Sequence, residues 1–236
     1  MARVPAFRLI ALFEMLSDDD LERVAEACTI RTYDRHAQIL SEQEQTTDIF
    51  FILSGTVRFS SYTANGREVI FNEISAGGIF GEFASVDRLP RSSNVTAMSD
   101  CMVARMSAEQ FHQVLLGNAA VGTRLAELLV AKIRQMSERV FEVSALTVRE
   151  RVRRELLRLA ATGTRFGNSV VIRPAPTHYD IAARIGSHRE AVTREFMRLE
   201  VERLIEVRRR QIRIVDIDRL AEATDDQSPT PRRSDA

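Results

Sequence analysis

Apolar positions in residues 177–204 recur at helical spacing and are interrupted once, at Gly186. Thr177 is a suitable N-cap, so the pattern predicts a short helix that ends near Ile185. A tight turn at the glycine and a second helix beginning at Ser187 follow. This second helix should bury one stripe of apolar residues, namely Ala191, Val192, Phe196, Leu199 and Leu204. Two helices joined by a glycine turn are typical of a helix-turn-helix.

The opposite face of the second helix carries polar groups near its start, at His188, Arg189, Glu190 and Arg194. Arginine can donate two hydrogen bonds to a guanine edge and glutamate can accept one from cytosine, so these positions favour a helix that reads DNA. Two ordinary interpretations fit as well. Ser187 and Glu190 have the spacing of a capping box, and an arginine-rich face is common on solvated helices.

The first half of the chain changes from a helical to a β pattern. Residues 6–28 predict helix, with Ser17 as an N-cap inside the segment. In residues 29–106 short β-rich runs alternate with turns, and Asn65-Gly66 between two such runs is a strong indication of a hairpin. This spacing is typical of a small barrel or sandwich. The segment 77–91 interrupts the pattern and marks one unusual loop.

A long helix is expected from about Ala119 to Leu146. Its apolar residues alternate spacings of three and four over nearly three heptads, which favours pairing with an identical helix. The residues expected in the homodimer interface, after Ala126 at the start of the seam, are Leu129, Ile133, Met136, Val140 and Val143. The alternative is a helix that packs only on its own domain, for which Leu125 and Leu128 provide a second apolar face. A homodimer suits DNA reading, because a two-fold protein matches a palindromic site.

The remaining segments complete a division into four parts. An arginine-rich helix is predicted at 149–161, a hairpin at 163–172, and two short strands around Arg209-Arg210 that form a wing. The polar, proline-containing end of the chain is expected to be disordered. The predicted domains are residues 1–118 (β-rich domain), 119–146 (dimerisation helix and hinge), 147–221 (winged helix-turn-helix) and 222–236 (disordered tail).

Composition changes this picture through the distribution of charge. The 236-residue chain holds 33 Lys or Arg and 33 Asp or Glu, so its formal net charge is zero. Residues 149–213, however, hold 16 arginines against 8 acidic residues, whereas residues 1–148 hold 14 basic and 19 acidic residues. A basic segment that coincides with the helix-turn-helix is typical of a domain that binds phosphates.

Several other classes of protein fit poorly. The sequence has no apolar run long enough to span a bilayer and no signal peptide, so we expect a cytoplasmic protein with no membrane partner. Cys28 and Cys101 stand alone, which argues against a disulfide framework, a zinc ribbon or an iron–sulfur cluster. A cupin-type metalloenzyme would need paired histidines on a strand, and the four histidines are scattered. We therefore expect neither a metal nor an enzyme.

The unusual loop carries the chemistry of an anion site. Residues 81–95 read GEFASVDRLPRSSNV. Arg91 can fork onto a phosphate, Ser92 and backbone N–H groups can complete the cradle, and Glu82 can accept hydrogen bonds from ribose hydroxyls. An internal salt bridge between Arg91 and Glu82 would account for the same residues, so the loop alone leaves both interpretations open.

The same loop is similar to the phosphate-binding cassette of cyclic-nucleotide-binding domains. The order of β-rich segment, cassette, long helix, arginine-rich helix and winged helix-turn-helix is also the same. Residues 6–216 thus resemble the bacterial cyclic AMP receptor protein family of transcription regulators, of the catabolite activator type. The resemblance implies an α+β fold, in which a β-roll with flanking helices is followed by a coiled-coil dimer helix and a winged helix-turn-helix. It also implies a cyclic-nucleotide-dependent, allosteric DNA-binding regulator.

The resemblance assigns roles to the cassette. It implies that Glu82 takes the ribose 2′-OH, that Arg91 and Ser92 bind the cyclic phosphate, and that Gly81 and Ser93 offer backbone groups. The family's Thr-Ser pair, whose serine comes from the partner subunit, falls at Met136-Ser137. The implied nucleotide-binding residues are Gly81, Glu82, Phe83, Arg91, Ser92, Ser93, Met136 and Ser137.

The departure at Met136 bears on the choice of effector. Ser137 matches the family pair, whereas Met136 lacks the hydroxyl and also lies on the heptad seam. Ser92 can reach a purine amine when the base is syn, as in cyclic-GMP-binding cassettes. Cyclic AMP is therefore the first choice of effector and cyclic GMP the second. A regulator of the same fold that senses haem or a small acid is the alternative, although His36, His112 and the cysteines are scattered.

The family's R-E-x3-R arrangement appears as Arg189-Glu190-x3-Arg194, which implies base contacts to inverted half-sites that begin TGT. The candidates for phosphate contacts are Thr177, His178, Tyr179 and His188. RNA polymerase is a further expected partner. The expected mechanism is allosteric: nucleotide between the cassette and the dimer helix reorients the seam near Val140 to Leu146 and so moves the DNA-binding domains.

Overall fold

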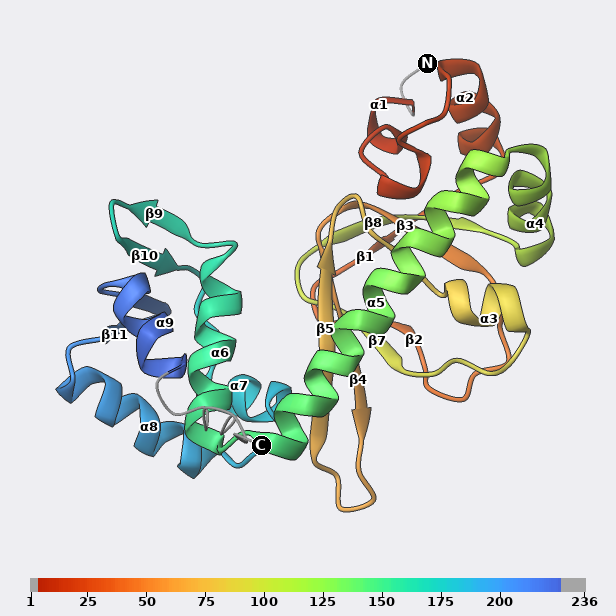
Figure 1. Cartoon of the computed structure of the whole chain (residues 1–236). Helices are drawn as coiled ribbons and strands as arrows, with labels where there is room; N and C mark the ends of the chain where they lie inside the picture. Colours follow the sequence, from red (N-terminus) through yellow and green to blue (C-terminus); the bar gives the residue numbers. More distant parts are fainter. Residues whose placement is uncertain (1–3, 226–236) are drawn as a thin grey trace, which may run out of the picture. The chain divides into compact units, whose positions relative to one another are not determined.

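The computed structural model describes residues 4–225 and has two compact units, residues 1–136 and 137–236 (Figure 1). The division falls within the long helix α5 (Ala119–Ala145). This helix is one residue shorter than predicted. The mixture of β-roll, long helix and C-terminal helix-turn-helix confirms the predicted α+β fold. The assignment of functional domains to residues 1–118, 119–146 and 147–221 stays a prediction.

Two antiparallel sheets of four strands build the roll of the first unit, with strand orders β1-β8-β3-β6 and β2-β7-β4-β5. Their interior is a hydrophobic cluster that includes Phe50, Ile52, Phe80 and Val103. The strands are β1 (Thr29–Tyr33), β2 (Gln38–Leu40), β3 (Ile49–Ser54), β4 (Thr56–Tyr62), β5 (Glu68–Ser75), β6 (Ile79–Phe80), β7 (Asn94–Ala97) and β8 (Cys101–Met106).

Turn chemistry explains how the strands connect. The hairpin between β4 and β5 closes where predicted: Gly66, at φ 78°, donates its N–H to Thr63 O at 2.8 Å. Glycine suits this position because it adopts positive φ without steric cost. Residues 94–106 form two strands, because a turn after Ala97 sends β7 and β8 into different sheets.

A second core lies between the roll and its helices. The helices are α1 (Val4–Phe7), the 3-10 helix η1 (Ala11–Phe13), α2 (Asp18–Glu26), α3 (Glu82–Asp87) and α4 (Ala108–Gly117). Phe7, Phe13, Phe51 and Phe111 are fully or almost fully buried in this core. The predicted N-cap of α2 is confirmed, since Ser17 Oγ accepts from Asp20 N at 3.2 Å.

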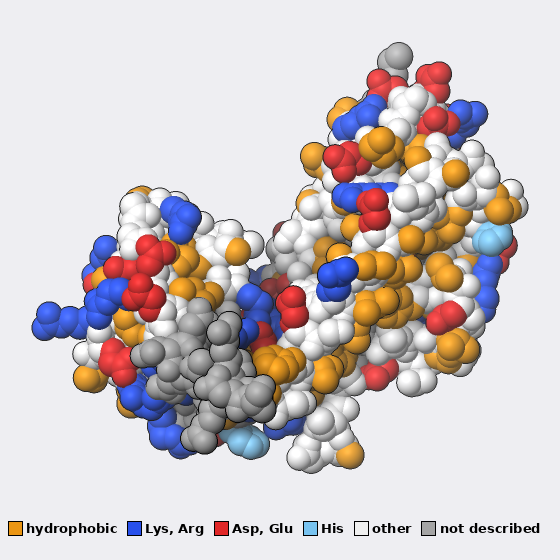
Figure 2. All heavy atoms as spheres, in the orientation of Figure 1, with side chains coloured by type: hydrophobic (Ala, Val, Ile, Leu, Met, Phe, Trp, Pro, Cys, Tyr) orange, Lys and Arg blue, Asp and Glu red, His pale blue; other side chains and the backbone are white. Residues whose placement is uncertain are grey.

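Helix α5 has two apolar faces with different surroundings. Leu125 is buried in the core of the first unit, and Leu128 and Leu129 pack against it. Four seam residues are exposed, Ile133, Met136, Val140 and Val143, with exposed fractions of 55–65 %. Hydrophobic side chains accordingly gather along α5 in Figure 2. The face that carries Leu125 and Leu128 therefore packs on the first unit. The seam residues after Leu129 are exposed in the single chain.

The second unit packs helices on a four-stranded antiparallel sheet of order β11-β12-β10-β9. Its core includes Leu156, Val170, Ile181, Phe196 and Ile212. The predicted hairpin and wing are both confirmed. The elements are α6 (Val148–Ala160), β9 (Thr164–Phe166), β10 (Ser169–Ile172), α7 (His178–Arg184), α8 (Arg189–Val201), β11 (Ile205–Arg208), β12 (Gln211–Ile214) and α9 (Ile217–Asp225).

The prediction of a disordered tail from residue 222 is wrong for its first residues. Residues 222–225 belong to α9, because Ile217, Leu220 and Ala223 have helical spacing and pack on the core of the unit. The rest of that predicted tail, residues 226–236, lies outside the described residues. Between residues 4 and 225 no single helix meets the length and hydropathy expected of a membrane span; α4 and α5 meet them only as a pair bent by 114°.

Candidate functional site

Gly81 gives the cassette its shape. It adopts φ 80° and is the N-cap of α3, which begins at Glu82. A Cβ atom at this position would lie 2.7 Å from Asp48 O and 2.8 Å from Arg91 Nη1. Both the backbone conformation and the space therefore require glycine. Glu82 therefore begins α3 directly after the glycine, and Arg91 Nη1 donates to the carbonyl of Gly81.

Arg91 is almost fully buried, with 3 % of its surface exposed. Its Nε donates to Thr46 Oγ1 at 3.0 Å, and its terminal nitrogens donate to Gly81 O at 3.2 Å and Asp48 O at 2.9 Å. Burial lowers the pKa of Arg91 from its usual value. A guanidinium has five N–H donors, so the three protein acceptors leave two for a further partner.

The backbone of Arg91 is held as firmly as its side chain. Arg91 N donates to Glu44 O at 3.0 Å, and Gln43 N donates to Arg91 O at 2.9 Å. The loop between β2 and β3 thus holds the cassette through backbone hydrogen bonds. A pocket of about 380 Å³ in the same unit is lined in part by Thr46 and Asp48, the supports of this arginine. A preformed, buried cation of this kind suits an anionic ligand.

Glu82 is also buried, and its partner comes from α5. Lys132 Nζ lies 2.6 Å from Glu82 Oε1 and 5.9 Å from the centre of the Phe83 ring. Glu82 makes no ion pair with Arg91 among the residues described, so the competing interpretation of the cassette as an internal salt bridge is wrong. Glu82 is paired with Lys132 instead, and Arg91 is held by neutral acceptors.

Sequence reasoning missed Lys132, Thr46 and Asp48. The contact from Lys132 to Glu82 spans fifty residues, and no local periodicity indicates it. One compositional observation could have found it: Lys132 is the only lysine in a chain otherwise supplied with arginine. A single lysine among so many arginines indicates a specific role, because the compact ammonium of lysine and the planar guanidinium of arginine are not interchangeable.

The other predicted cassette residues are less enclosed. Ser92 is exposed and Ser93 is half-buried, and both follow directly on Arg91. Met136 is 61 % exposed on the seam, and Ser137 is exposed at the next position of α5. Gly81, Glu82, Phe83 and Arg91 are therefore brought together with Lys132 in the first unit. The contributions of Met136 and Ser137 to a site stay predictions.

The helix-turn-helix forms nearly as predicted. Thr177 caps α7 through a capping box with Asp180, and Gly186 makes the turn at φ 62°. The alternative interpretation of Ser187 and Glu190 as a capping box is wrong. His188 is the N-cap of α8 and makes no side-chain capping bond, because Ser187 is buried in the turn and donates its N–H to Ala182 O at 2.9 Å. The Ser187 and Glu190 pair is therefore not a capping box.

The charged face at the start of α8 is exposed. Arg189, Glu190 and Arg194 have no ion-pair partner in the part of the chain that the structure describes. Glu190 and Arg194 have the spacing of a stabilising helical pair, yet no pair forms. Near the other end of α8, Arg198 Nε does pair with Glu202 Oε1 at 2.8 Å. The charges at the start of the helix are thus exposed to solvent.

The predicted phosphate contacts lie at the starts of α7 and α8. Tyr179 and His188 are exposed, and the Thr177 hydroxyl is engaged in its capping box. His178 has a positioning role as well: its Nδ1 lies 2.9 Å from Thr193 Oγ1, and its ring lies 4.5 Å from that of Phe196. Burial, with a smaller effect of Arg189, lowers the pKa of His178.

The wing lies beside the same helix pair. Arg208, Arg209 and Arg210 are exposed at the turn between β11 and β12. Arg210 O accepts from Ala175 N at 3.0 Å, which places the wing turn next to the chain that enters α7. The basic wing and the start of the helix-turn-helix are therefore parts of one surface. No group of three or more potential metal ligands occurs in residues 4–225.

Two family models match the chain. Residues 30–118 match a cyclic nucleotide-binding domain, and residues 150–223 match a Crp-like helix-turn-helix domain. The cAMP-activated global transcriptional regulator CRP of Salmonella typhimurium is 26 % identical over 190 residues, which is 80 % of this chain and 90 % of the relative. The match thus extends over both units.

Solved structures show the same fold. A CooA mutant from Carboxydothermus hydrogenoformans superposes with a TM-score of 0.76 at 17 % identity, over 92 % of this chain and 95 % of that one. The c-di-GMP responsive global regulator CLP of Xanthomonas campestris gives a TM-score of 0.72 at 18 % identity, over 84 % and 99 % of the two chains. The fold is therefore shared by regulators that respond to different molecules.

Proposed function

This chain belongs to the cyclic AMP receptor protein family of DNA-binding transcription regulators, which are not enzymes, and we propose that its effector is 3′,5′-cyclic AMP. The family match gives a cyclic-nucleotide-binding domain and a DNA-binding domain. The observation that supports a nucleotide effector most directly is the buried guanidinium of Arg91, held by three neutral acceptors beside the buried carboxylate of Glu82.

The residues of the cassette fit the two chemical parts of a cyclic nucleotide. Arg91 would hold the cyclic phosphate through its remaining N–H donors, with Ser92 and the backbone groups of Ser93 and Gly81 beside it. The Glu82 carboxylate would accept from the ribose 2′-OH. The ammonium of Lys132 contacts the same carboxylate and lies over the Phe83 ring.

The purine is the less specified part of the effector. The family's hydroxyl is absent at Met136, while Ser137 retains one. Cyclic GMP is therefore the second candidate, because Ser92 is exposed and free to reach a guanine amine. Met136 is 61 % exposed on the seam, where a partner helix would bury it. We accordingly assign Met136 to the dimer interface first and to the purine second.

The DNA site proposed is a palindrome with half-sites that begin TGT. Arg189, Glu190 and Arg194 would contact base edges, since their charges have no partner within the described chain. Thr177, Tyr179 and His188 would contact phosphates, and His178 would hold α7 against α8. Pairing of Leu129, Ile133, Met136, Val140 and Val143 with a second copy would set the two recognition helices on one palindrome.

The proposed coupling begins at Lys132. This residue joins the cassette to α5 within the first unit, so a nucleotide that contacts Glu82 and Arg91 also acts on the dimer helix. The nucleotide changes DNA affinity only if it binds the DNA-ready state more tightly. In the cytoplasm the bound regulator would act on RNA polymerase at promoters.

Fluorescence anisotropy tests the proposal. The labelled duplex carries a TGT-type palindrome, the salt is fixed, and the arms contain no nucleotide, cyclic AMP, cyclic GMP or cyclic di-GMP. Binding that tightens with cyclic AMP alone supports the proposal, and tightening with cyclic GMP as well makes the protein a dual sensor. A scrambled duplex is the control. Tight binding without nucleotide, or a response to cyclic di-GMP only, would refute it.

A further inference from the structure

One arginine of helix α6 differs from the other arginines of that helix in its hydrogen bonding. The helix carries five arginines, and four of them contact carboxylates or carbonyls of the second unit, namely Arg149, Arg151, Arg153 and Arg158. Arg154 donates no hydrogen bond among the residues described, and its Nε is buried. A buried donor without a partner in the protein is typical of a position that contacts a ligand, an ion or water.

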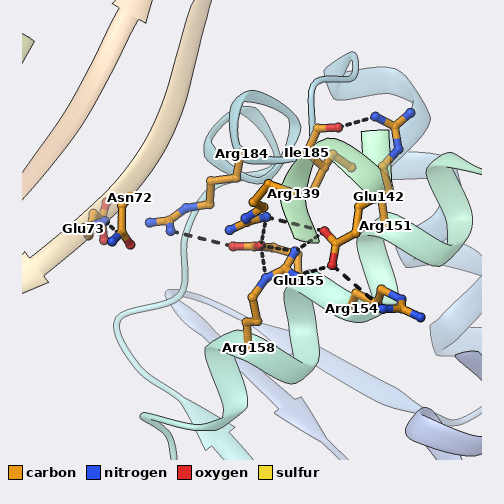
Figure 3. Close-up of polar contacts among 10 residues, drawn as sticks. All are labelled: Asn72, Glu73, Arg139, Glu142, Arg151, Arg154, Glu155, Arg158, Arg184 and Ile185. Atoms are coloured by element: carbon orange, nitrogen blue, oxygen red, sulfur yellow. Dashed lines mark hydrogen bonds and ion pairs between the residues drawn. The ribbon is translucent and has the colours of Figure 1, made fainter. Parts of the chain in front are cut away.

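The carboxylates near Arg154 are occupied by other groups (Figure 3). Its one ion pair in the described part of the chain is with Glu142, at 4.0 Å. Glu142 is almost fully buried and is forked by Arg158, whose Nη1 and Nη2 lie 2.7 Å and 3.1 Å from its two carboxylate oxygens. Glu150, one helical turn before Arg154, accepts from Thr147 N and Oγ1. The charge of Arg154 is therefore only weakly compensated within residues 4–225.

Arg154 lines a pocket of about 330 Å³ between α5 and α6. The other residues that line it belong to α5, and they are Ser137, Glu138, Phe141 and Glu142. Glu138 and Glu142 lie two positions before and after Val140 of the predicted seam, so they face about 160° away from it around the helix. The pocket therefore lies on a face of α5 that pairing along the seam does not use.

The pocket combines three kinds of chemical group. Arg154 offers guanidinium N–H donors, which suit a carboxylate. Glu138 is exposed and has no ion-pair partner among the described residues, so its carboxylate can accept from an ammonium. The ring of Phe141 is 58 % exposed and offers an apolar face to a planar ring. A simple anion would be repelled by Glu138 and a simple cation by Arg154, whereas a zwitterion satisfies both.

We propose that this pocket binds an aromatic amino acid, with its carboxylate on Arg154, its ammonium on Glu138 and its ring against Phe141. Such a ligand takes up the donors and the charge that the described chain leaves without close partners. Of the lining residues, only Ser137 is shared with those proposed for the nucleotide. The site is therefore distinct from the cassette, and the regulator would bind an amino acid in addition to its nucleotide.

Isothermal titration calorimetry on the full-length protein tests the ligand class. L-phenylalanine should bind saturably. Three analogues each lack one group: 3-phenylpropanoate has no ammonium, phenethylamine has no carboxylate, and L-alanine has no ring. Each analogue should bind at least about 10-fold more weakly than L-phenylalanine. No saturable binding of L-phenylalanine up to roughly 10 mM, or equal affinity for L-phenylalanine and L-alanine, would overturn the proposal.

Two variants locate the charged groups of the ligand. Arg154→Gln should raise the Kd for L-phenylalanine at least about 10-fold and change that for phenethylamine less than about twofold. Glu138→Gln should weaken L-phenylalanine and leave 3-phenylpropanoate within about twofold of the wild type. Because Arg154 makes no hydrogen bond in the described chain, the melting temperature of Arg154→Gln without ligand should stay within about 2 °C of the wild type. A lowered melting temperature with unchanged affinity would make Arg154 merely structural and refute the site.

The matched control is Arg149→Gln. Arg149 is another arginine of α6, its side chain is 28 % exposed against 34 % for Arg154, and it pairs with Glu195 outside the pocket. This variant should bind L-phenylalanine like the wild type, and so should Arg91→Lys in the cassette. Loss of binding in Arg149→Gln would mean that the effect comes from α6 as a whole. Loss in Arg91→Lys would locate the ligand in the cassette, and either result would overturn the proposal.

Discussion

Replacing Arg91 with lysine keeps the positive charge of the cassette but removes the guanidinium fork. The arginine donates to Thr46 Oγ1, Gly81 O and Asp48 O at 2.9–3.2 Å, and these bonds aim its remaining N–H donors. A lysine ammonium is a point donor on a flexible stem, so it cannot both satisfy these acceptors and fork onto a phosphate. We expect Arg91→Lys to lose most of the affinity for cyclic AMP.

The size of the loss follows from the bonds that lysine cannot make. A hydrogen bond to a charged group contributes about 1.5–3 kcal/mol. If one of two bonds to the phosphate is lost, the Kd rises about 10- to 150-fold, since each 1.4 kcal/mol is roughly a factor of ten. At a nucleotide concentration about 1,000 times the wild-type Kd, the stabilisation by ligand should fall from about 4.1 to about 1.2–2.7 kcal/mol.

Isothermal titration calorimetry measures the Kd, and thermal unfolding with and without cyclic AMP measures the stabilisation. Arg58→Lys is the matched control, because Arg58 is also a largely buried arginine of the first unit, lies outside the cassette and pairs with Glu73 at 2.8 Å. Wild-type affinity in Arg91→Lys would refute the reasoning. An equal loss of affinity in Arg58→Lys would refute it too, because the effect would then come from the fold.

Three further predictions concern the DNA face, the seam and a histidine. Arg194→Ala should raise the Kd for the palindrome about 5- to 150-fold for each half-site, measured by anisotropy. Arg198→Ala should change this Kd less than about twofold, because the Arg198 side chain pairs with Glu202. Val140→Glu should convert the dimer to a monomer in light scattering, because the seam would bury a charge, and the exposed off-seam variant Ala131→Glu should remain dimeric. Burial lowers the pKa of His178, so the folded state resists its protonation and stability should fall as the pH drops below about 6.5. In urea unfolding at pH 7 and pH 5 this fall should be smaller for His178→Gln, and an equal fall would contradict the assignment.

Features of the fold with a local cause were predictable from sequence. Ser17 and Thr177 cap helices because their hydroxyls accept from the N–H of an acidic residue at N3, a pattern that lies within four residues. Strands without a local pattern were not predictable from sequence. In β1 the residues alternate poorly between exposed and buried, and β6 has only two residues and exists because it pairs with β3. Their positions depend on tertiary pairing, which no short window contains.

The residues of the candidate site divide in the same way, into those that a local motif identifies and those that come from distant segments. Gly81, Glu82 and Arg91 lie within one short loop, so a motif could identify them. Their supports could not be identified, because Thr46, Asp48 and Lys132 reach the loop from distant segments. The error at Ser187 has a similar origin. Its capping pattern is intact in sequence, but the turn buries the serine and uses its N–H, so His188 becomes the cap.

The arginines of the two sites show how burial indicates the kind of ligand. Burying a guanidinium costs free energy unless its donors are satisfied, and Arg91 meets this cost with neutral acceptors. Asp48, which lies on its supporting loop, has its carboxylate paired with Arg105 at 2.8 Å. Among the residues described, no carboxylate forms an ion pair with Arg91, which therefore keeps a positive charge in a buried position. Arg189 and Arg194 are exposed, and in the proposed complex they would lose their hydration only on contact with DNA. A small enclosed effector thus requires a preformed site, whereas a large polyanion can organise side chains that are free in solution.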